Sequence, residues 1–478
     1  MMQHDLASLR PLIVLAATTI LLMLVVSGRR SHRVAFGITL AGLLMAFLSL
    51  FAASELPYTV GSLLTFDGYA RFYSGLILLA TAATAILSFG YLQQCDETRE
   101  EYYALLLLAA LGGLVLVAAS HFASLFLGLE LLSISLYALI AYVRVENREI
   151  EAGLKYLILA AVSAAFLLFG IAMIYADLGT LAFTGLTRVS YGSLAGPGRV
   201  LVLGGVGFIM VGFAFKLALV PFHLWIPDVY QGAPAPVTGF VATVSKGAMF
   251  AALLRLFGPL DVRIGHSLFL MFATLAVASM IGGNLLALLQ QNLKRLLAYS
   301  SIAHFGYLLV AFLASGTQAA VAVSFYLVAY FITTIGAFGV VTILSSGGAE
   351  IETVNEYRGL AVRRPGASSV LTIMLLSLAG IPMTAGFVGK FYVALTAAGA
   401  TLWTLLIVML VTSGVGLFYY LRFIAAMYMH PGREMVAAAL VPRVSAQVLL
   451  AALVGLLVWL GLYPAPLIRL IQAALAAA

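Results

Sequence analysis

The chain consists largely of apolar runs that are each long enough to cross a lipid bilayer. A transmembrane helix needs about 20 consecutive, mostly apolar residues. Because 63% of the residues are hydrophobic and only 9% are charged, a soluble globular fold is excluded. We expect an all-α polytopic membrane protein, a single transmembrane domain over residues 1–478, with fourteen helices at 11–28, 34–53, 74–92, 103–119, 122–143, 152–176, 199–220, 235–256, 267–289, 295–314, 319–345, 367–399, 402–428 and 445–462.

The basic residues of the connecting loops predict the orientation. With both termini outside, fourteen lysines and arginines fall on the cytoplasmic side and seven on the outer side, as the positive-inside rule requires. The cytoplasmic set is Arg29, Arg30, Arg33, Arg99, Arg144, Arg148, Lys294, Arg295, Arg358, Arg363, Arg364, Arg422, Arg433 and Arg443, and the outer set is Arg10, Arg71, Arg188, Arg199, Arg255, Arg263 and Arg469. We therefore expect both termini on the periplasmic side of a bacterial inner membrane. The formal net charge of +7 lies in these loops, so we expect contact with membrane lipids and no nucleic-acid binding.

The chain offers few groups that could hold a cofactor. Its single cysteine, Cys95, cannot form an internal disulfide, and an iron–sulfur cluster needs about four thiolates. The sequence shows no phosphate loop, nucleotide-binding fingerprint or metal-ligand cluster. We expect no cofactor to be bound by this chain, and any electron transfer to take place in another subunit.

Three of the five lysines, Lys216, Lys246 and Lys390, lie inside or at the edge of apolar runs. A charged side chain near the bilayer centre costs roughly 3 kcal/mol on insertion scales, so such residues usually line an internal cavity and carry function. The alternative is that each lysine extends to the membrane surface. Lysine, unlike arginine, can release its proton when it is buried. The pattern therefore favours a protein that moves protons.

Two of the runs contain helix-breaking residues beside these lysines. The seventh run leads from Lys216 into a segment with four prolines, and the twelfth contains LAGIPMTAGFVGKF, residues 378–391, which includes Lys390. Breaks within a membrane are tolerated mainly where the freed backbone groups line a cavity, and paired breaks are typical of a transport site. We predict breaks near Pro221 and Pro382, with each lysine one or two turns away.

Glu130 and His304 are the other ionisable residues placed for chemistry within the runs. We expect Glu130 to face Lys216 and to pair with it directly or through one water, which would avoid an unpaired buried carboxylate. The alternative is that Ser133 and Ser135 satisfy it. Histidine titrates nearest neutral pH, which suits a relay, although His304 could also be a neutral ring bonded to a backbone carbonyl.

The segment FKLALVPFHLWIPDVYQGAPAPVTGFVATVSKGAMF, residues 215–250, resembles the signature of the antiporter-like membrane subunits of respiratory complex I, the proton-pumping NADH:quinone oxidoreductase. The resemblance extends to LGLELLSISLYALIA at 127–141, NLKRLLAYSSIAHFGYLL at 292–309 and LAGIPMTAGFVGKFY at 378–392. Within this family, VYQGAPAPV looks like the N type and not the L and M types. Lysine at position 390, where the M type usually has glutamate, agrees.

The resemblance implies a fold with two inverted five-helix repeats, each containing one broken helix. The first three helices, at 11–92, precede the first repeat at about 103–256. The second repeat follows at about 267–428, and the last helix at about 445–462.

The resemblance also implies the roles of the residues singled out above. Glu130 and Lys216 act as a coupled pair, Lys246 as the central relay and Lys390 as the terminal group, with His304 as a link between the repeats. We expect the three lysines and His304 to lie at similar depth near the bilayer midplane.

In such a complex, electron transfer from NADH to quinone in other subunits drives proton transport through this one. The resemblance places NADH, FMN, iron–sulfur clusters and quinone in partner subunits. It implies an antiporter-like M-type neighbour and the small K-, J- and A-type subunits as partners.

Other functions stay open on the sequence. A subunit of an Mrp-type cation/proton antiporter shares this fold, although VYQGAPAPV argues against it, and a membrane subunit of a related hydrogenase is a further alternative. A scaffold that only anchors a redox arm would gain nothing from three lysines inside the membrane.

Overall fold

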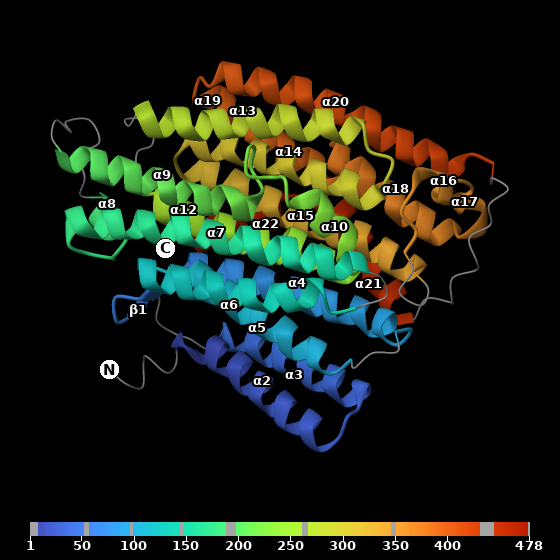
Figure 1. Ribbon diagram of the computed structural model, residues 1–478. Coiled ribbons are helices and arrows are strands. Elements are labelled where there is room, and N and C mark those ends of the chain that lie inside the picture. Colours follow the sequence, from blue (N-terminus) through green and yellow to red (C-terminus); the bar gives the residue numbers. More distant parts are fainter. Residues whose placement is uncertain are drawn as a thin grey trace.

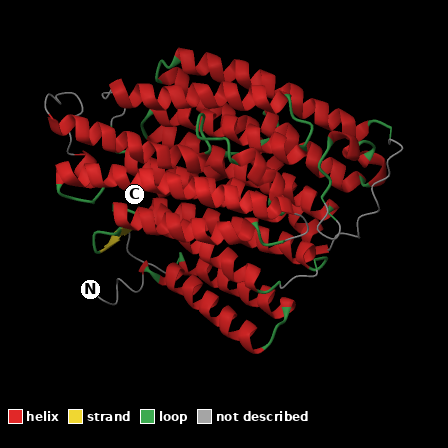
Figure 2. Cartoon of the chain, in the orientation of Figure 1, coloured by secondary structure: helices red, strands yellow, loops and turns green. Residues whose placement is uncertain are grey.

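The computed structural model describes residues 8–51, 57–95, 99–143, 147–187, 197–260, 266–345, 350–430 and 444–476. Almost all of the described chain is helical (Figure 2). Five of the loop arginines used to predict the orientation lie outside the described residues, namely Arg144, Arg188, Arg263, Arg433 and Arg443.

The elements follow one another as a series of long helices with short connections. In chain order they are α2 (Arg10–Gly28), α3 (His32–Ser49), β1 (Tyr58–Val60), β2 (Leu64–Phe66), α4 (Gly68–Leu92), α5 (Glu101–Ala118), α6 (Phe122–Ile140), α7 (Asn147–Leu178), α8 (Thr184–Thr187), α9 (Pro197–Leu217), α10 (Ile226–Gly232), α11 (Ala235–Phe240), the π-helix η1 (Val241–Ser245), α12 (Lys246–Phe257), α13 (His266–Leu288), α14 (Leu293–Ala314), α15 (Thr317–Leu344), α16 (Val354–Tyr357), α17 (Leu360–Arg363), α18 (Pro365–Ala379), α19 (Ala385–Gly399), α20 (Trp403–Tyr428), α21 (Val444–Leu462) and α22 (Ala465–Ala476).

The predicted membrane spans are confirmed. Within the described residues, 13 helices are long and apolar enough to cross a membrane, and the shorter helices α18 and α19 together form the remaining predicted span. The agreement has a simple cause. In lipid each backbone polar group must be satisfied within its own segment, so a long apolar run has little choice but to form a helix.

Both predicted breaks are present. Helix α9 ends at Leu217, directly after Lys216, and the chain turns through Ala218, whose φ is +57°, before α10 begins. Helix α18 ends at Ala379 and is followed by Gly380, whose φ is +87°. Five residues separate α18 from α19.

Three features were not predicted from the sequence. Strands β1 and β2 form an antiparallel hairpin, and α22 follows the last membrane span. The segment 235–256, expected as one continuous helix, contains the π-helical stretch Val241–Ser245 directly before Lys246. Such π segments are rare and are often found at functional sites.

The long helices lie side by side in a broad bundle (Figure 1). Helices α2 and α3 form one edge of it, α13 and α20 form the opposite edge, and α14 and α15 run through the middle. The spans α14 and α15 are almost entirely buried, as expected of helices that are apolar on all sides.

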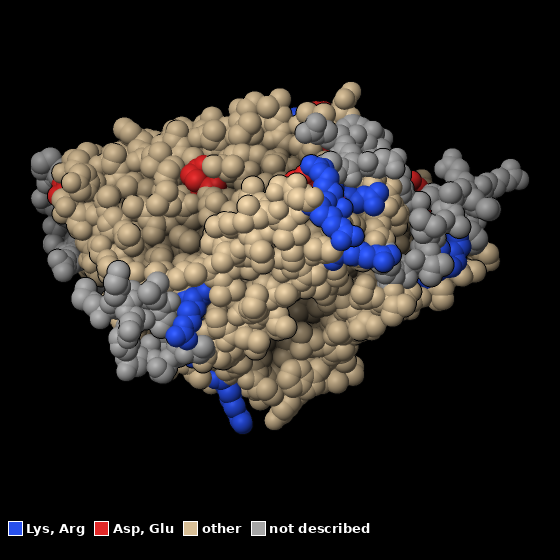
Figure 3. All heavy atoms as spheres, turned by 90° about the horizontal axis from the view of Figure 1, so that it is seen from below, with Lys and Arg blue, Asp and Glu red and all other residues tan. Residues whose placement is uncertain are grey.

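The two ends of the bundle differ in what they carry. Both chain termini and β1 lie at one end, and α16 and α17 lie at the other (Figure 1). On the face shown in Figure 3, most lysine and arginine side chains gather toward the end that carries α16 and α17, and the middle of the face is mainly uncharged.

Candidate functional site

Lys216 is held by two hydroxyl groups at the first helix break. Its ammonium donates to Ser133 Oγ at 2.6 Å and to the Tyr156 hydroxyl at 2.9 Å. It also lies 4.9 Å from the centre of the Tyr156 ring. Only 4% of Lys216 is exposed. A cation is favoured here because Lys216 lies in the last turn of α9, where unpaired carbonyl groups carry partial negative charge.

Glu130 lies on α6 within electrostatic range of Lys216. The two side chains do not form a direct ion pair within 4 Å, although both are among the described residues. Two of the three N–H donors of the ammonium go to Ser133 and Tyr156 instead. A contact through one water, which the expectation also allowed, stays a prediction. Glu130 is half-buried, and the neighbouring Leu127 and Ile134 are exposed.

Lys246 lies in the centre of the bundle and is completely buried. It is the first residue of α12 after the π-helical stretch. Its ammonium donates to Ser301 Oγ at 2.8 Å. The rings of Phe305 and Tyr230 lie 5.0 Å and 5.9 Å from it. A buried cation with a single hydroxyl partner and aromatic neighbours is weakly compensated.

His304 interacts electrostatically with both Lys246 and Lys390. Its Nδ1 is 2.6 Å from the Tyr326 hydroxyl, and its Nε2 is 3.3 Å from the Tyr420 hydroxyl. The alternative of a ring bonded to a backbone carbonyl does not describe this geometry. Because both ring nitrogens face hydroxyl groups, the ring can accept a proton on one side and release one on the other.

Lys390 lies at the second helix break. Its ammonium donates to the backbone oxygen of Ala379, the last residue of α18, at 2.9 Å. It also donates to Ser413 Oγ on α20 at 2.9 Å, and it lies 5.4 Å from the centre of the Tyr307 ring. The carbonyl end of α18 therefore stabilises the ammonium, as the carbonyl end of α9 does for Lys216.

A row of polar side chains on one face of α14 connects Lys246 to Lys390. Ser301, His304 and Tyr307 follow at intervals of three residues, which places them on the same side of the helix. They contact Lys246, Tyr326 and Lys390 in that order. Between Lys216 and Lys246 lie two tyrosines, Tyr156 and Tyr230, which interact electrostatically with each other.

Most of these hydroxyl partners were not singled out in the sequence. Tyr156, Tyr326, Ser413 and Tyr420 lie on helices that are apolar overall, and Ser133 was considered only as a partner of Glu130. Only the spacing of Ser301 relative to His304 was a usable signal, since serine and tyrosine are frequent in such helices.

A second polar network lies at the end of the bundle that carries α16 and α17. Lys294, near the start of α14, forms a buried ion pair with Glu350 at 2.6 Å. Glu352 accepts hydrogen bonds from Arg148, Gln231 and Asn292. The sequence had placed Lys294 only among the loop charges.

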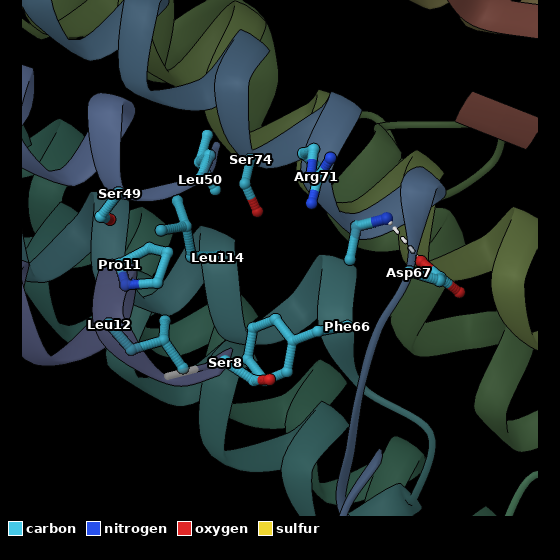
Figure 4. A pocket seen from close by; sticks show the side chains of 11 residues that line it. Ser8, Pro11, Leu12, Ser49, Leu50, Phe66, Asp67, Arg71, Ser74 and Leu114 are labelled. Carbon is cyan, nitrogen blue, oxygen red and sulfur yellow. Dashed lines mark hydrogen bonds between the residues drawn. The ribbon is translucent and has the colours of Figure 1, made fainter. Parts of the chain in front are cut away.

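A small surface cavity lies away from these residues. It has a volume of about 30 Å³, lies beside α2 and α4, and contains none of the predicted site residues (Figure 4). At its edge Asp67 accepts from the backbone N–H of Ala70 at 2.7 Å, which caps α4, and forms an ion pair with Arg255 at 2.8 Å. The described part of the chain contains no group of three or more His, Cys, Asp or Glu residues that could hold a metal ion.

Comparison with known proteins gives a consistent result. Residues 119–416 match the family model described as NADH:quinone oxidoreductase/Mrp antiporter, TM. The chain is 47% identical over 480 residues to NADH-quinone oxidoreductase subunit N of Ectopseudomonas mendocina (strain ymp), covering 98% of this chain and 96% of that protein.

Solved structures of three complexes contain similar chains. One is in respiratory complex I from Thermus thermophilus with bound aureothin, at 36% identity and a TM-score of 0.82, covering 96% of this chain and 98% of that one. Another is in the membrane-bound sulfane sulfur reductase, an archaeal respiratory membrane complex, at 26% identity and 0.86, covering 98% and 97%. A third is in the Mrp complex from Dietzia sp. DQ12-45-1b, at 18% identity and 0.85, covering 99% and 97%. The same fold therefore occurs in all three complexes. Of the three, the chain from respiratory complex I has the highest sequence identity to this chain.

Proposed function

This chain belongs to the NADH:quinone oxidoreductase/Mrp antiporter family of membrane subunits, and from that premise we propose that Lys216, Lys246, His304 and Lys390 form its path for protons within the membrane. It is a multi-pass membrane protein and a proton-translocating membrane-arm subunit of NADH:quinone oxidoreductase, respiratory complex I. Its partners are other subunits of that complex.

The finer arrangement is part of the proposal. An antiporter-like M-type subunit and the small K-, J- and A-type subunits are its neighbours, and NADH, FMN, iron–sulfur clusters and quinone are bound by partner subunits. The termini face the periplasm of a bacterial inner membrane. On the face shown in Figure 3, the gathering of basic side chains toward the end opposite the termini supports this orientation.

The observation that carries the proposed path is the burial of three lysines without a direct carboxylate partner. Each is held mainly by hydroxyl or carbonyl groups. Removing an ammonium from water costs several kcal/mol, and a hydroxyl compensates for this only in part. Each lysine can therefore exist in protonated and neutral forms, which is what a relay needs.

The roles follow from the positions of the side chains. Glu130 is half-buried between exposed apolar residues and within range of Lys216, so it senses events in a neighbouring subunit and alters the charge of Lys216. Lys246 is the central relay. His304 passes the proton between Lys246 and Lys390 through its two hydroxyl contacts.

Replacing Lys246 tests the path. In the assembled complex, reconstituted in liposomes, Lys246→Met should remove most NADH-driven proton transport while assembly stays normal. Lys246→Arg should not restore transport, because arginine keeps the charge but does not release the proton. Lys155, an exposed lysine paired with Glu151 and Asp228, provides the control, and Lys155→Met should pump normally. Full pumping by the Lys246→Arg variant would contradict a role in which this residue gives up its proton.

A further inference from the structure

The ion pair between Lys294 and Glu350 is the most deeply buried one among the described residues, with side-chain exposures of 2% and 7%. It lies outside the row formed by Lys216, Lys246, His304 and Lys390. Burying two charges costs more free energy than their attraction usually returns. A contribution to folding stability therefore does not explain why both residues of this buried pair are charged.

The pair bridges the gap between α10 and α11. Lys294 also donates to the backbone oxygen of Ala233 at 2.7 Å, just past the end of α10. Glu350 accepts from the backbone N–H of Ala235, the first residue of α11, at 2.7 Å, and from the Tyr91 hydroxyl at 3.1 Å. Neutral side chains could make the same hydrogen bonds, so capping alone does not explain why both residues are charged.

A neighbouring carboxylate belongs to a separate network nearer the surface. Glu352, two residues after Glu350, bonds to the exposed side chain of Arg148 and to Gln231 and Asn292. The other titratable groups that face Glu350 are Tyr91 on α4 and Tyr357 on α16.

Lys294 also lies on the face of α14 that carries the partner of Lys246. Lys294 and Ser301 are seven residues apart, so they lie on the same face of α14 about 10 Å apart along its axis. Ser301 is the hydrogen-bond partner of Lys246. A proton crosses such a distance over three or four hydrogen bonds of about 2.8 Å.

Tyr230 lies close to Lys246, on the helix whose end Lys294 contacts. It lies on α10, three residues before Ala233, and its ring is 5.9 Å from the Lys246 ammonium. Its hydroxyl is fully buried and makes no hydrogen bond of good geometry within the described part of the chain, although Ser301 is near it. A buried hydroxyl without a partner costs free energy, and this one is able to accept and donate a proton.

We propose that the Lys294–Glu350 pair is the inlet through which protons reach Lys246, with the Tyr230 hydroxyl as the intermediate step. This rests on the proposed function of Lys246 as the central relay. It assigns two charged residues and a tyrosine to the path that supplies that relay from the end of the bundle carrying α16 and α17.

The steps conserve protons and charge. A hydronium ion on the solvent side protonates the Glu350 carboxylate and leaves water, which breaks the ion pair. The Lys294 ammonium then gives a proton to the Tyr230 hydroxyl as that hydroxyl passes its own proton to the neutral Lys246 amine. Finally the Glu350 carboxyl group returns its proton to the Lys294 amine, which restores the pair. The net result is one proton moved from solvent to Lys246.

Three conservative variants of the assembled complex in liposomes test the inlet, each measured as the initial rate of NADH-driven proton uptake. Tyr230→Phe removes only a hydroxyl that lacks a well-formed hydrogen bond. Glu350→Gln keeps acceptors for Ala235 and Tyr91 but cannot act as a carboxylate. Lys294→Arg keeps the ion pair but cannot release a proton. We expect each to lower the rate by roughly tenfold or more, since losing a positioned proton-transfer group typically costs at least that much.

Two further variants separate this role from a structural one. Glu350→Asp retains the carboxylate and should recover part of the rate that Glu350→Gln loses, at equal assembly. Glu352→Gln changes a neighbouring carboxylate of the same loop and should pump nearly normally. Wild-type rates in Tyr230→Phe and Lys294→Arg, together with a loss in Lys246→Met, would overturn the inlet and leave the relay intact. A wild-type rate in Lys246→Met would refute the relay itself.

Discussion

The substitution Gly380→Ala tests whether the position of the Lys390 ammonium matters for transport. Gly380 follows α18 directly and has a φ of +87°. A Cβ atom at this position would lie 2.9 Å from Cδ and 3.3 Å from Nζ of Lys390. These are the nearest atoms to it, and they belong to the flexible end of a side chain. The substitution should therefore displace the lysine rather than disrupt helix packing.

The size of the effect follows from two costs. Alanine in the left-handed region loses about 1–2 kcal/mol of stability. Moving Nζ away from the Ala379 carbonyl, now 2.9 Å away, removes a hydrogen bond to a charged group worth about 1.5–3 kcal/mol. About 1.4 kcal/mol corresponds to a factor of ten. The loss of this hydrogen bond alone should therefore make the protonated form of Lys390 about 10- to 100-fold less favourable.

The assay is NADH-driven proton uptake by inside-out membrane vesicles, normalised to the amount of assembled complex. We expect the rate to fall by roughly tenfold. Gly399→Ala is the matched control, because Gly399 ends α19, the helix that carries Lys390, and an added Cβ would meet no atom within 4 Å. Wild-type pumping by a normally assembled Gly380→Ala complex would show that the bond between Lys390 and the end of α18 is not needed.

Further predictions concern the first helix break and helix packing. Ser133→Ala and Tyr156→Phe each remove one partner of the Lys216 ammonium, so each should weaken its protonated form by about 1.5–3 kcal/mol and slow proton uptake. Ser135→Ala, which affects only a bond to the Leu131 carbonyl, should not. Gly170→Ala places a Cβ 2.5 Å from the Gly205 oxygen where α7 meets α9. Its overpacking should cost about 1–3 kcal/mol and lower the midpoint of thermal unfolding of the complex, whereas Gly207→Ala, in open space on α9, should leave it unchanged.

Much of the fold could be predicted because the relevant forces act locally in the chain. In lipid an apolar run of sufficient length forms a helix whatever surrounds it, so the predicted spans agree with the helices to within a few residues at most boundaries. Proline and glycine act on their own backbone, so the breaks near Pro221 and Pro382 were also predictable. The β1–β2 hairpin and α22 were not, since three-residue strands and a helix of 12 residues are too short for these rules.

The candidate site divides in the same way. The cost of an ammonium within an apolar run can be read from the sequence alone, so Lys216, Lys246 and Lys390 could be identified without a structure. What each ammonium contacts depends on which helix faces pack together. The partners of Lys216 lie 83 and 60 residues away in the chain, and Glu130 interacts with Lys216 without a direct ion pair.

The composition and order of this sequence thus determined that the chain crosses the membrane many times, where two of its helices break and which lysines are buried, because lipid penalises each polar group where it stands. Only the tertiary structure decided that Ser301, His304 and Tyr307 connect two of those lysines and that Lys294 meets Glu350 at the end of α10. Hydrogen bonds and ion pairs need atoms within about 3 Å of one another. Residues on different helices come that close only when the bundle has packed.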